Sequence, residues 1–153
     1  MRYVALSAIL FAIGIGLTQL QADEQAYVPV VRMRTADGHF VTLLASKRLG
    51  RSACQQTVDQ FAAPLRVCAA CSIESMGCTT GLSGIDKALA EGQPLPVYAV
   101  VGESGIRVSV VGPPETVKAQ CEAIAQHMVR NGMKSAACMY PASRSTQSPS
   151  QQL

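Results

Sequence analysis

Residues 28–35 form a largely apolar run, and residues 40–45 form a second one. Both runs are rich in β-branched residues, which fit the pleated surface of a strand. Asp37 and Gly38 lie between the two runs, and this dipeptide is typical of the tight turn that joins antiparallel strands. The pattern therefore predicts a β-hairpin near the start of the chain.

After this hairpin the apolar positions change to helical spacing. Cys54, Val58 and Phe61 recur on one face of a predicted helix, and Pro64 is expected to end it. The apolar run 65–73 that follows predicts a strand. The first half of the chain is therefore expected to form a ββαβ unit.

The same order of elements returns in the second half, because residues 28–71 align with residues 95–138 without a gap. The aligned cysteines are Cys54 with Cys121 and Cys71 with Cys138. A short extra helix is expected at 83–92, between the two copies. Two such units predict an α+β fold in which an antiparallel sheet carries helices on one face, in a ferredoxin-like arrangement stapled by disulfides.

The two ends of the chain differ from this middle part. Residues 3–17 form an uncharged apolar run that follows Arg2, which predicts a secretory signal peptide over residues 1–22, with an uncleaved anchor as the alternative. Residues 142–153 are almost entirely polar and predict a disordered tail. The folded domain is thus expected at 23–141, in a periplasmic or secreted protein with no membrane span once the signal is removed.

Six cysteines in an exported chain favour structural disulfides. The alignment of the two copies predicts three bridges, which are Cys54–Cys71, Cys121–Cys138 and Cys68–Cys78. Two other uses of the pair Cys68 and Cys71 are weighed against this pairing, namely thiol redox chemistry and a metal site. Redox chemistry is disfavoured because the pair falls inside a predicted strand rather than at a helix start. We expect neither a metal nor another cofactor, because an even number of cysteines in an exported chain favours disulfides.

The sequence contains no recognisable catalytic motif. Its two histidines, His39 and His127, belong to no serine–histidine–aspartate pattern, and its carboxylates are scattered. The chain carries 13 Lys and Arg against 10 Asp and Glu, a surplus too small to argue for nucleic acid. We therefore expect a binding protein rather than an enzyme.

Strand alternation divides the predicted hairpins into two faces. The apolar face, expected under the helices, carries Val31, Met33, Val41, Leu43, Tyr98, Val100, Val108 and Val110. The opposite face, expected to be open, carries the candidate ligand-binding residues Arg32, Arg34, Phe40, Thr42, Arg107 and Ser109. Arginines with an aromatic ring and hydroxyls can contact an anionic or sugar-like polymer. The alternative is an ordinary solvated sheet face.

Residues 106–114, followed by an alanine-containing helix that stops at Gly132 and by a strand, resemble the second half of a sporulation-related repeat (SPOR) domain. Residues 40–44 with the helix from Ala53 would form its first half. The resemblance implies a module that binds peptidoglycan glycan strands in the bacterial envelope. The alternative partner is an envelope protein, contacted as an inhibitor or accessory subunit through the loop around Cys78 and residues 79–81.

Overall fold

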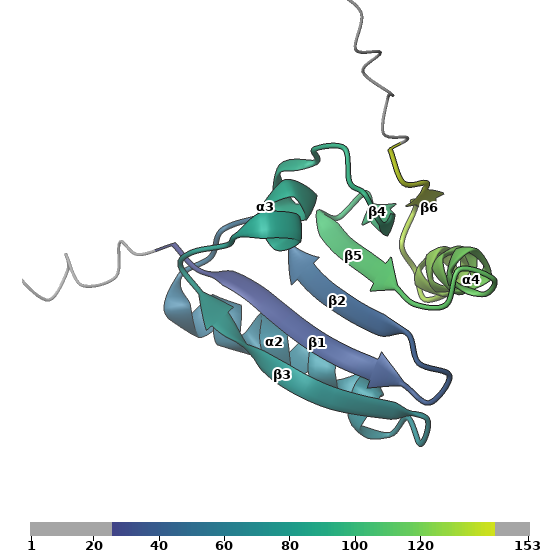
Figure 1. Ribbon diagram of the computed structural model, residues 1–153. Coiled ribbons are helices and arrows are strands. Elements are labelled where there is room, and N and C mark those ends of the chain that lie inside the picture. The colour runs from purple at the N-terminus through teal and green to yellow at the C-terminus, as the bar shows by residue number, and fades with distance from the viewer. Residues whose placement is uncertain (1–25, 143–153) are drawn as a thin grey trace, which may run out of the picture.

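The computed structural model describes residues 26–142 and shows an α+β fold built on one six-stranded antiparallel sheet. The strand order is β3-β1-β2-β5-β4-β6 (Figure 1). In chain order the elements are β1 (Val28–Thr35), β2 (Phe40–Ala45), α2 (Arg51–Arg66), β3 (Cys71–Thr79), α3 (Gly84–Glu91), β4 (Tyr98–Gly102), β5 (Ile106–Val111), α4 (Val117–Arg130) and β6 (Ala136–Met139).

Each of the two predicted hairpins is present. β1 pairs with β2 and β4 pairs with β5, both antiparallel. The turns contain Gly38 and Gly105, whose φ angles of 87° and 80° lie in the left-handed region that glycine adopts without steric cost. The pairing of β2 with β5, which runs from Phe40 opposite Val111 to Ala45 opposite Ile106, joins the two hairpins at the centre of the sheet.

The long helices α2 and α4 cover one face of the sheet, and the main core lies beneath them. Val117, Cys121 and Ala125 of α4 pack against strand residues that include Val41 and Val108. The predicted apolar face is confirmed by the burial of Val31, Met33, Val41, Val100, Val108 and Val110, with Leu43 and Tyr98 partly buried at its margin.

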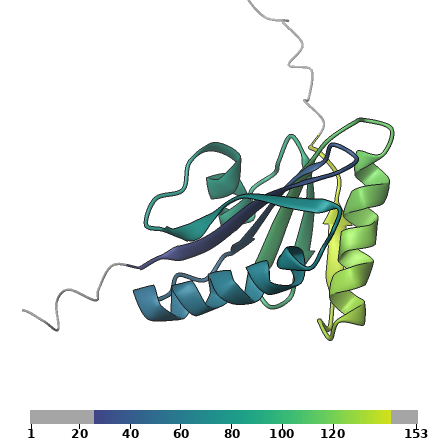
Figure 2. The same ribbon diagram turned by 90° about the horizontal axis from the view of Figure 1, so that it is seen from below.

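The opposite face is covered in part by α3, which is a correction to the expectation that it is open. α3 contacts β2 and β5, and Figure 2 shows it across the sheet from α2. Its residue Leu89 is 2% exposed and packs against Val30, Leu44 and Ala99. Val30 and Leu44 lie two positions along their strands from the polar candidates Arg32 and Thr42, and therefore on the same face. This face thus has a small core of its own.

The predicted helix end is wrong by two residues, and the predicted third strand is displaced by six. α2 continues past Pro64 to Arg66, and Leu65 in its last turn packs against the main core. β3 starts at Cys71, close to where the predicted strand was to finish, and runs to Thr79. The first part of the segment between the predicted copies, residues 72–79, therefore belongs to the sheet.

The three disulfides are Cys54–Cys78, Cys68–Cys71 and Cys121–Cys138. The prediction of Cys121–Cys138 is confirmed, whereas those of Cys54–Cys71 and Cys68–Cys78 are wrong. Cys54 lies in the first turn of α2, and the helix carries the chain away from it by about 1.5 Å per residue. β3 then runs back along α2, so that the end of the strand, not its start, returns to Cys54.

Candidate functional site

The six candidate ligand-binding residues lie on the sheet face that carries α3, but they differ in accessibility. Thr42 and Ser109 are paired across β2 and β5 and are only 3% and 4% exposed. Phe40, at the start of β2, is half-buried. The hydroxyl groups therefore form the floor of this face, and the aromatic ring lies nearer to solvent.

The three candidate arginines each have a partner within the chain. Arg32 forms an ion pair with Asp86 of α3, and Arg34 Nε donates to Glu74 Oε1 at 2.7 Å. Arg107 donates through a terminal nitrogen to the backbone oxygen of Gly102 at 3.1 Å. The charges of Arg32 and Arg34 are thus balanced by carboxylates, which makes this face much less basic than the sequence alone implied.

Two adjoining recesses lie beside α3, and four of the six candidates line the first of them. This recess has a volume of about 380 Å³ and is lined by Arg32, Phe40, Thr42, Ser83, Ile85, Asp86, Ser109 and Val111. The second, of about 260 Å³, lies over β1, β3 and the loop before α3. Because Arg32, Ser83 and Asp86 line both, the two recesses adjoin at these residues, and we call them together the α3 site.

The α3 site combines apolar and polar surface in a small space. In the first recess Phe40 and Ile85 are apolar walls, and the Arg32–Asp86 pair supplies both donors and acceptors. In the second recess the loop is held by its own contacts, since Thr79 Oγ1 donates to the oxygen of Gly81 at 2.8 Å. Such a site suits a ligand that has hydroxyl groups as well as apolar faces. Neither Arg34 nor Arg107 lines it.

The pair Cys68 and Cys71 is placed differently from the thiols of an oxidoreductase. The two residues are bonded to each other in the turn between the end of α2 and the start of β3. A reactive thiol is favoured at a helix N-terminus, where the helix dipole stabilises the thiolate. Cys68 and Cys71 lie after the C-terminal end of α2, where the dipole has the opposite sign and does not stabilise a thiolate.

A contact that the sequence did not predict joins Asp37, His39 and Thr116. The side chain of His39 is 1% exposed, and its Nε2 lies 3.0 Å from Thr116 Oγ1. Its Nδ1 lies 3.0 Å from Asp37 Oδ2 but forms no hydrogen bond. A hydrogen bond from Thr35, followed by the contact with His39, lowers the pKa of Asp37 from its usual 3.8.

These distances are similar to those of a hydroxyl–imidazole–carboxylate triad, but the arrangement differs from a catalytic one. Neither His39 nor Thr116 lines the α3 site. The contact instead ties the β1–β2 turn to the start of α4. Asp37 and His39 are close in sequence, but no local signal marks Thr116 as their partner.

Comparison with protein-family models, curated proteins and solved structures finds no match to this chain. Within residues 26–142, no helix has the length and apolar character needed to cross a membrane. The same part of the chain contains no group of three or more histidine, cysteine or acidic side chains placed to hold a metal ion. The predicted signal peptide and nearly all of the predicted tail lie outside the described residues.

Proposed function

We propose that this chain is a non-catalytic binding module of the bacterial envelope that binds a linear carbohydrate polymer, the glycan strands of peptidoglycan, at the α3 site. Three disulfides are compatible with a protein that works outside the cytoplasm, in the periplasm or secreted. The predicted signal peptide and the SPOR-like residues 40–71 and 96–140 support the same proposal.

The observation that carries the proposal is that the two recesses lie side by side and share Arg32, Ser83 and Asp86 in their lining. A polymer needs an extended site in which successive units meet similar groups. Phe40 offers an apolar surface to the carbon–hydrogen face of a sugar ring, and the Arg32–Asp86 pair offers partners for its hydroxyls. Phe40 is the one aromatic residue among the described residues that line the α3 site, so we expect weak binding to each sugar unit.

Co-sedimentation with purified cell-wall sacculi tests this proposal. Phe40→Ala removes the aromatic wall and is expected to weaken binding by about tenfold, which corresponds to about 1.4 kcal/mol. Arg34→Gln is the matched control, because Arg34 lies on the neighbouring strand and the same face but does not line the α3 site. Absence of co-sedimentation at low salt, or equal losses in both variants, would contradict the proposal.

We also propose that the two halves of the domain are copies of one ββαβ unit. The sheet order reads β3-β1-β2 in one half and β6-β4-β5, counted from the opposite edge, in the other. In each half, the first strand of the hairpin, β1 or β4, therefore lies between the second hairpin strand, β2 or β5, and the strand that follows the helix, β3 or β6. The ferredoxin-like description stays a prediction.

A second candidate function is binding to an envelope protein through the loop that follows β3. This loop is held by the Cys54–Cys78 bridge and by the contacts between Thr79 and Gly81. A loop that is already ordered loses little entropy on binding. Capture of a defined partner that is lost in Thr79→Val, without any binding to sacculi, would favour this function over the first.

A further inference from the structure

A second, separate groove lies on the other side of the sheet, between α2 and α4. It has a volume of about 600 Å³, within the range of small-molecule sites. Its floor is formed by Met33, Val41 and Val108 of the sheet. Its walls include Phe61 and Leu65 of α2 and Ile124 and Met128 of α4. We call it the helix groove.

Val41 and Val108 form part of the floor of the helix groove but are 0% and 1% exposed, because neighbouring side chains cover them. An α-helix with its side chains is about 10 Å across, so a volume of about 600 Å³ would hold little more than one turn of it. A single alkyl chain does fit, and the flexible side chains of Met33, Met128 and Met133 can adjust around it.

The charges along the groove favour one sign of ligand. The residues that line it include no carboxylate, whereas Arg130 lies at its edge in the last turn of α4. Arg130 is exposed and forms no ion pair with any residue in the described part of the chain. An anionic group at the end of an apolar chain would therefore meet an uncompensated cation.

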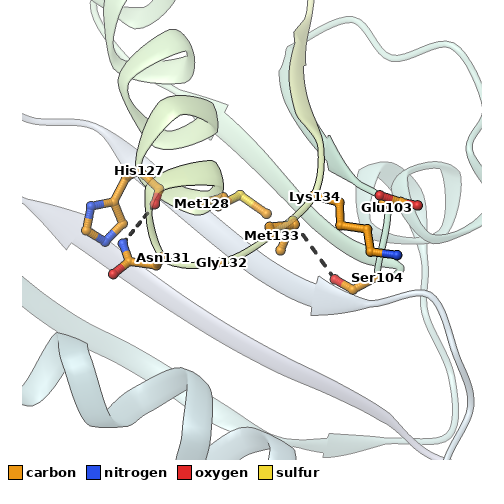
Figure 3. Close-up of a pocket in the computed structure, with 8 residues that line it drawn as sticks. All are labelled: Glu103, Ser104, His127, Met128, Asn131, Gly132, Met133 and Lys134. Carbon is orange, nitrogen blue, oxygen red and sulfur yellow. Dashed lines mark hydrogen bonds between the residues drawn. The ribbon is translucent and has the colours of Figure 1, made fainter.

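The groove continues past the end of α4 into a hollow of about 570 Å³, shown in Figure 3. His127, Met128 and Met133 line both spaces. In Figure 3 the side chains of Met128 and Met133 approach each other, and Lys134 lies beside Ser104 and Glu103 at the outer rim. The hollow thus adds a second cation, Lys134, together with the carboxylate of Glu103 and polar groups, so Arg130 remains the one cation without a nearby carboxylate among the described residues that line the two spaces.

We infer that the helix groove binds a single acyl chain with an anionic head group, the chain lying between α2 and α4 and the head group beside Arg130 and Lys134. This inference does not depend on the proposed function, because the α3 site and the helix groove lie on opposite faces and share no lining residue. A free fatty acid is the simplest ligand of this chemistry.

Titration calorimetry of the disulfide-bonded protein with decanoate, dodecanoate and tetradecanoate, each below its micelle concentration, tests the inference. Each additional pair of buried methylene groups is expected to tighten binding by about fifteenfold. Dodecyltrimethylammonium, which has the same chain and the opposite charge, is expected to bind at least about tenfold more weakly than dodecanoate. An affinity that does not change with chain length would overturn the inference.

Two variants with matched controls locate the binding. Ile124→Gln, in the groove wall, is expected to abolish chain-length dependence, whereas Val129→Gln on the same helix, 42% exposed and outside the lining, is not. Arg130→Gln is expected to weaken dodecanoate binding by about threefold and to leave dodecanol binding unchanged. Arg51→Gln, an exposed arginine at the start of α2, is its control. Equal effects in variant and control would overturn the assignment.

Two other occupants are outcomes of the same experiment. If a chain that retains residues 1–22 does not bind dodecanoate whereas a chain that begins at Asp23 does, the apolar leader fills the groove before its removal, and the inference holds for the processed protein alone. If sedimentation equilibrium shows a dimer that dodecanoate does not dissociate and dodecanoate does not bind, a second copy fills it and the inference fails. A monomer that binds dodecanoate in both forms supports it.

Discussion

Removal of the Cys54–Cys78 bridge is expected to destabilise the protein more than removal of the Cys68–Cys71 bridge. The bridged residues are 24 positions apart in the first pair and 3 apart in the second. In the chain-entropy model, closing these loops stabilises the folded state by about 3.4 and about 1.6 kcal/mol respectively. The double variant Cys54→Ala, Cys78→Ala should therefore lose about 1.8 kcal/mol more than Cys68→Ala, Cys71→Ala.

Urea unfolding of the two double variants and the unaltered protein measures this difference, provided that the dependence of the unfolding free energy on urea is compared as well as the midpoint. Equal losses, or a larger loss in the Cys68–Cys71 variant, would refute the reasoning. The pairing itself can be checked beforehand by mass spectrometry.

Peptide mapping requires a cut between Cys71 and Cys78, and Met76 offers one to cyanogen bromide. Together with trypsin, this cut places Cys54, the Cys68–Cys71 segment and Cys78 on three peptides. We expect the middle peptide to be released alone, lighter than its reduced form by two hydrogens. A single species that links all three peptides would show that Cys68 and Cys71 are bonded to Cys54 and Cys78 instead of to each other, as in the pairing Cys54–Cys71 with Cys68–Cys78.

Three further predictions concern stability. The pKa of Asp37 is lowered in the folded state, so its contacts stabilise the fold above the unfolded-state pKa, and this contribution is lost as the pH falls below about 4. The free energy of unfolding should therefore differ more between about pH 5 and about pH 3 in the unaltered protein than in Asp37→Asn. An identical difference in both would count against the contacts. Thr116→Val leaves Nε2 of the buried His39 without its partner and should cost about 1 to 2 kcal/mol in urea unfolding; an unchanged midpoint would show that the contact is not formed in solution. Leu89→Ala should cost about 3 kcal/mol by the same measurement, because Leu89 is the buried anchor of α3. A cost below about 1 kcal/mol would mean that α3 is not docked on the sheet.

The hairpins and the buried face of each long helix could be predicted from the sequence, because they rest on local spacing. Cys121 and Ala125 recur on one side of α4, and both are buried. The length of β3 could not be predicted, because residues after Cys71 alternate weakly and the strand is irregular between its pairings with Arg32 and Met33. The predicted bridges Cys54–Cys71 and Cys68–Cys78 depended on where β3 lies, and both are therefore wrong. Cys121–Cys138 does not involve β3, and its prediction is confirmed.

The candidate site was predicted in part for a related reason. Strand alternation placed Arg32 and Phe40 correctly on one face. It did not show that α3 would dock there, since docking depends on Leu89 meeting apolar residues from three strands, including Val30 and Leu44. The balance of charge at Arg32 likewise follows from the position of Asp86, which is 54 residues away and belongs to no local pattern.

All three covalent links are confined to one half of the domain or the other. The two halves are joined without a covalent link by the β2–β5 ladder, by the contacts of α3, by the packing of α4 against Val41 and by the contact of His39 with Thr116. A force applied to the two ends would therefore be expected to part the domain between the halves while each cross-linked lobe stayed compact. A polymer or partner bound across α3 would then add contacts between two halves that no disulfide joins.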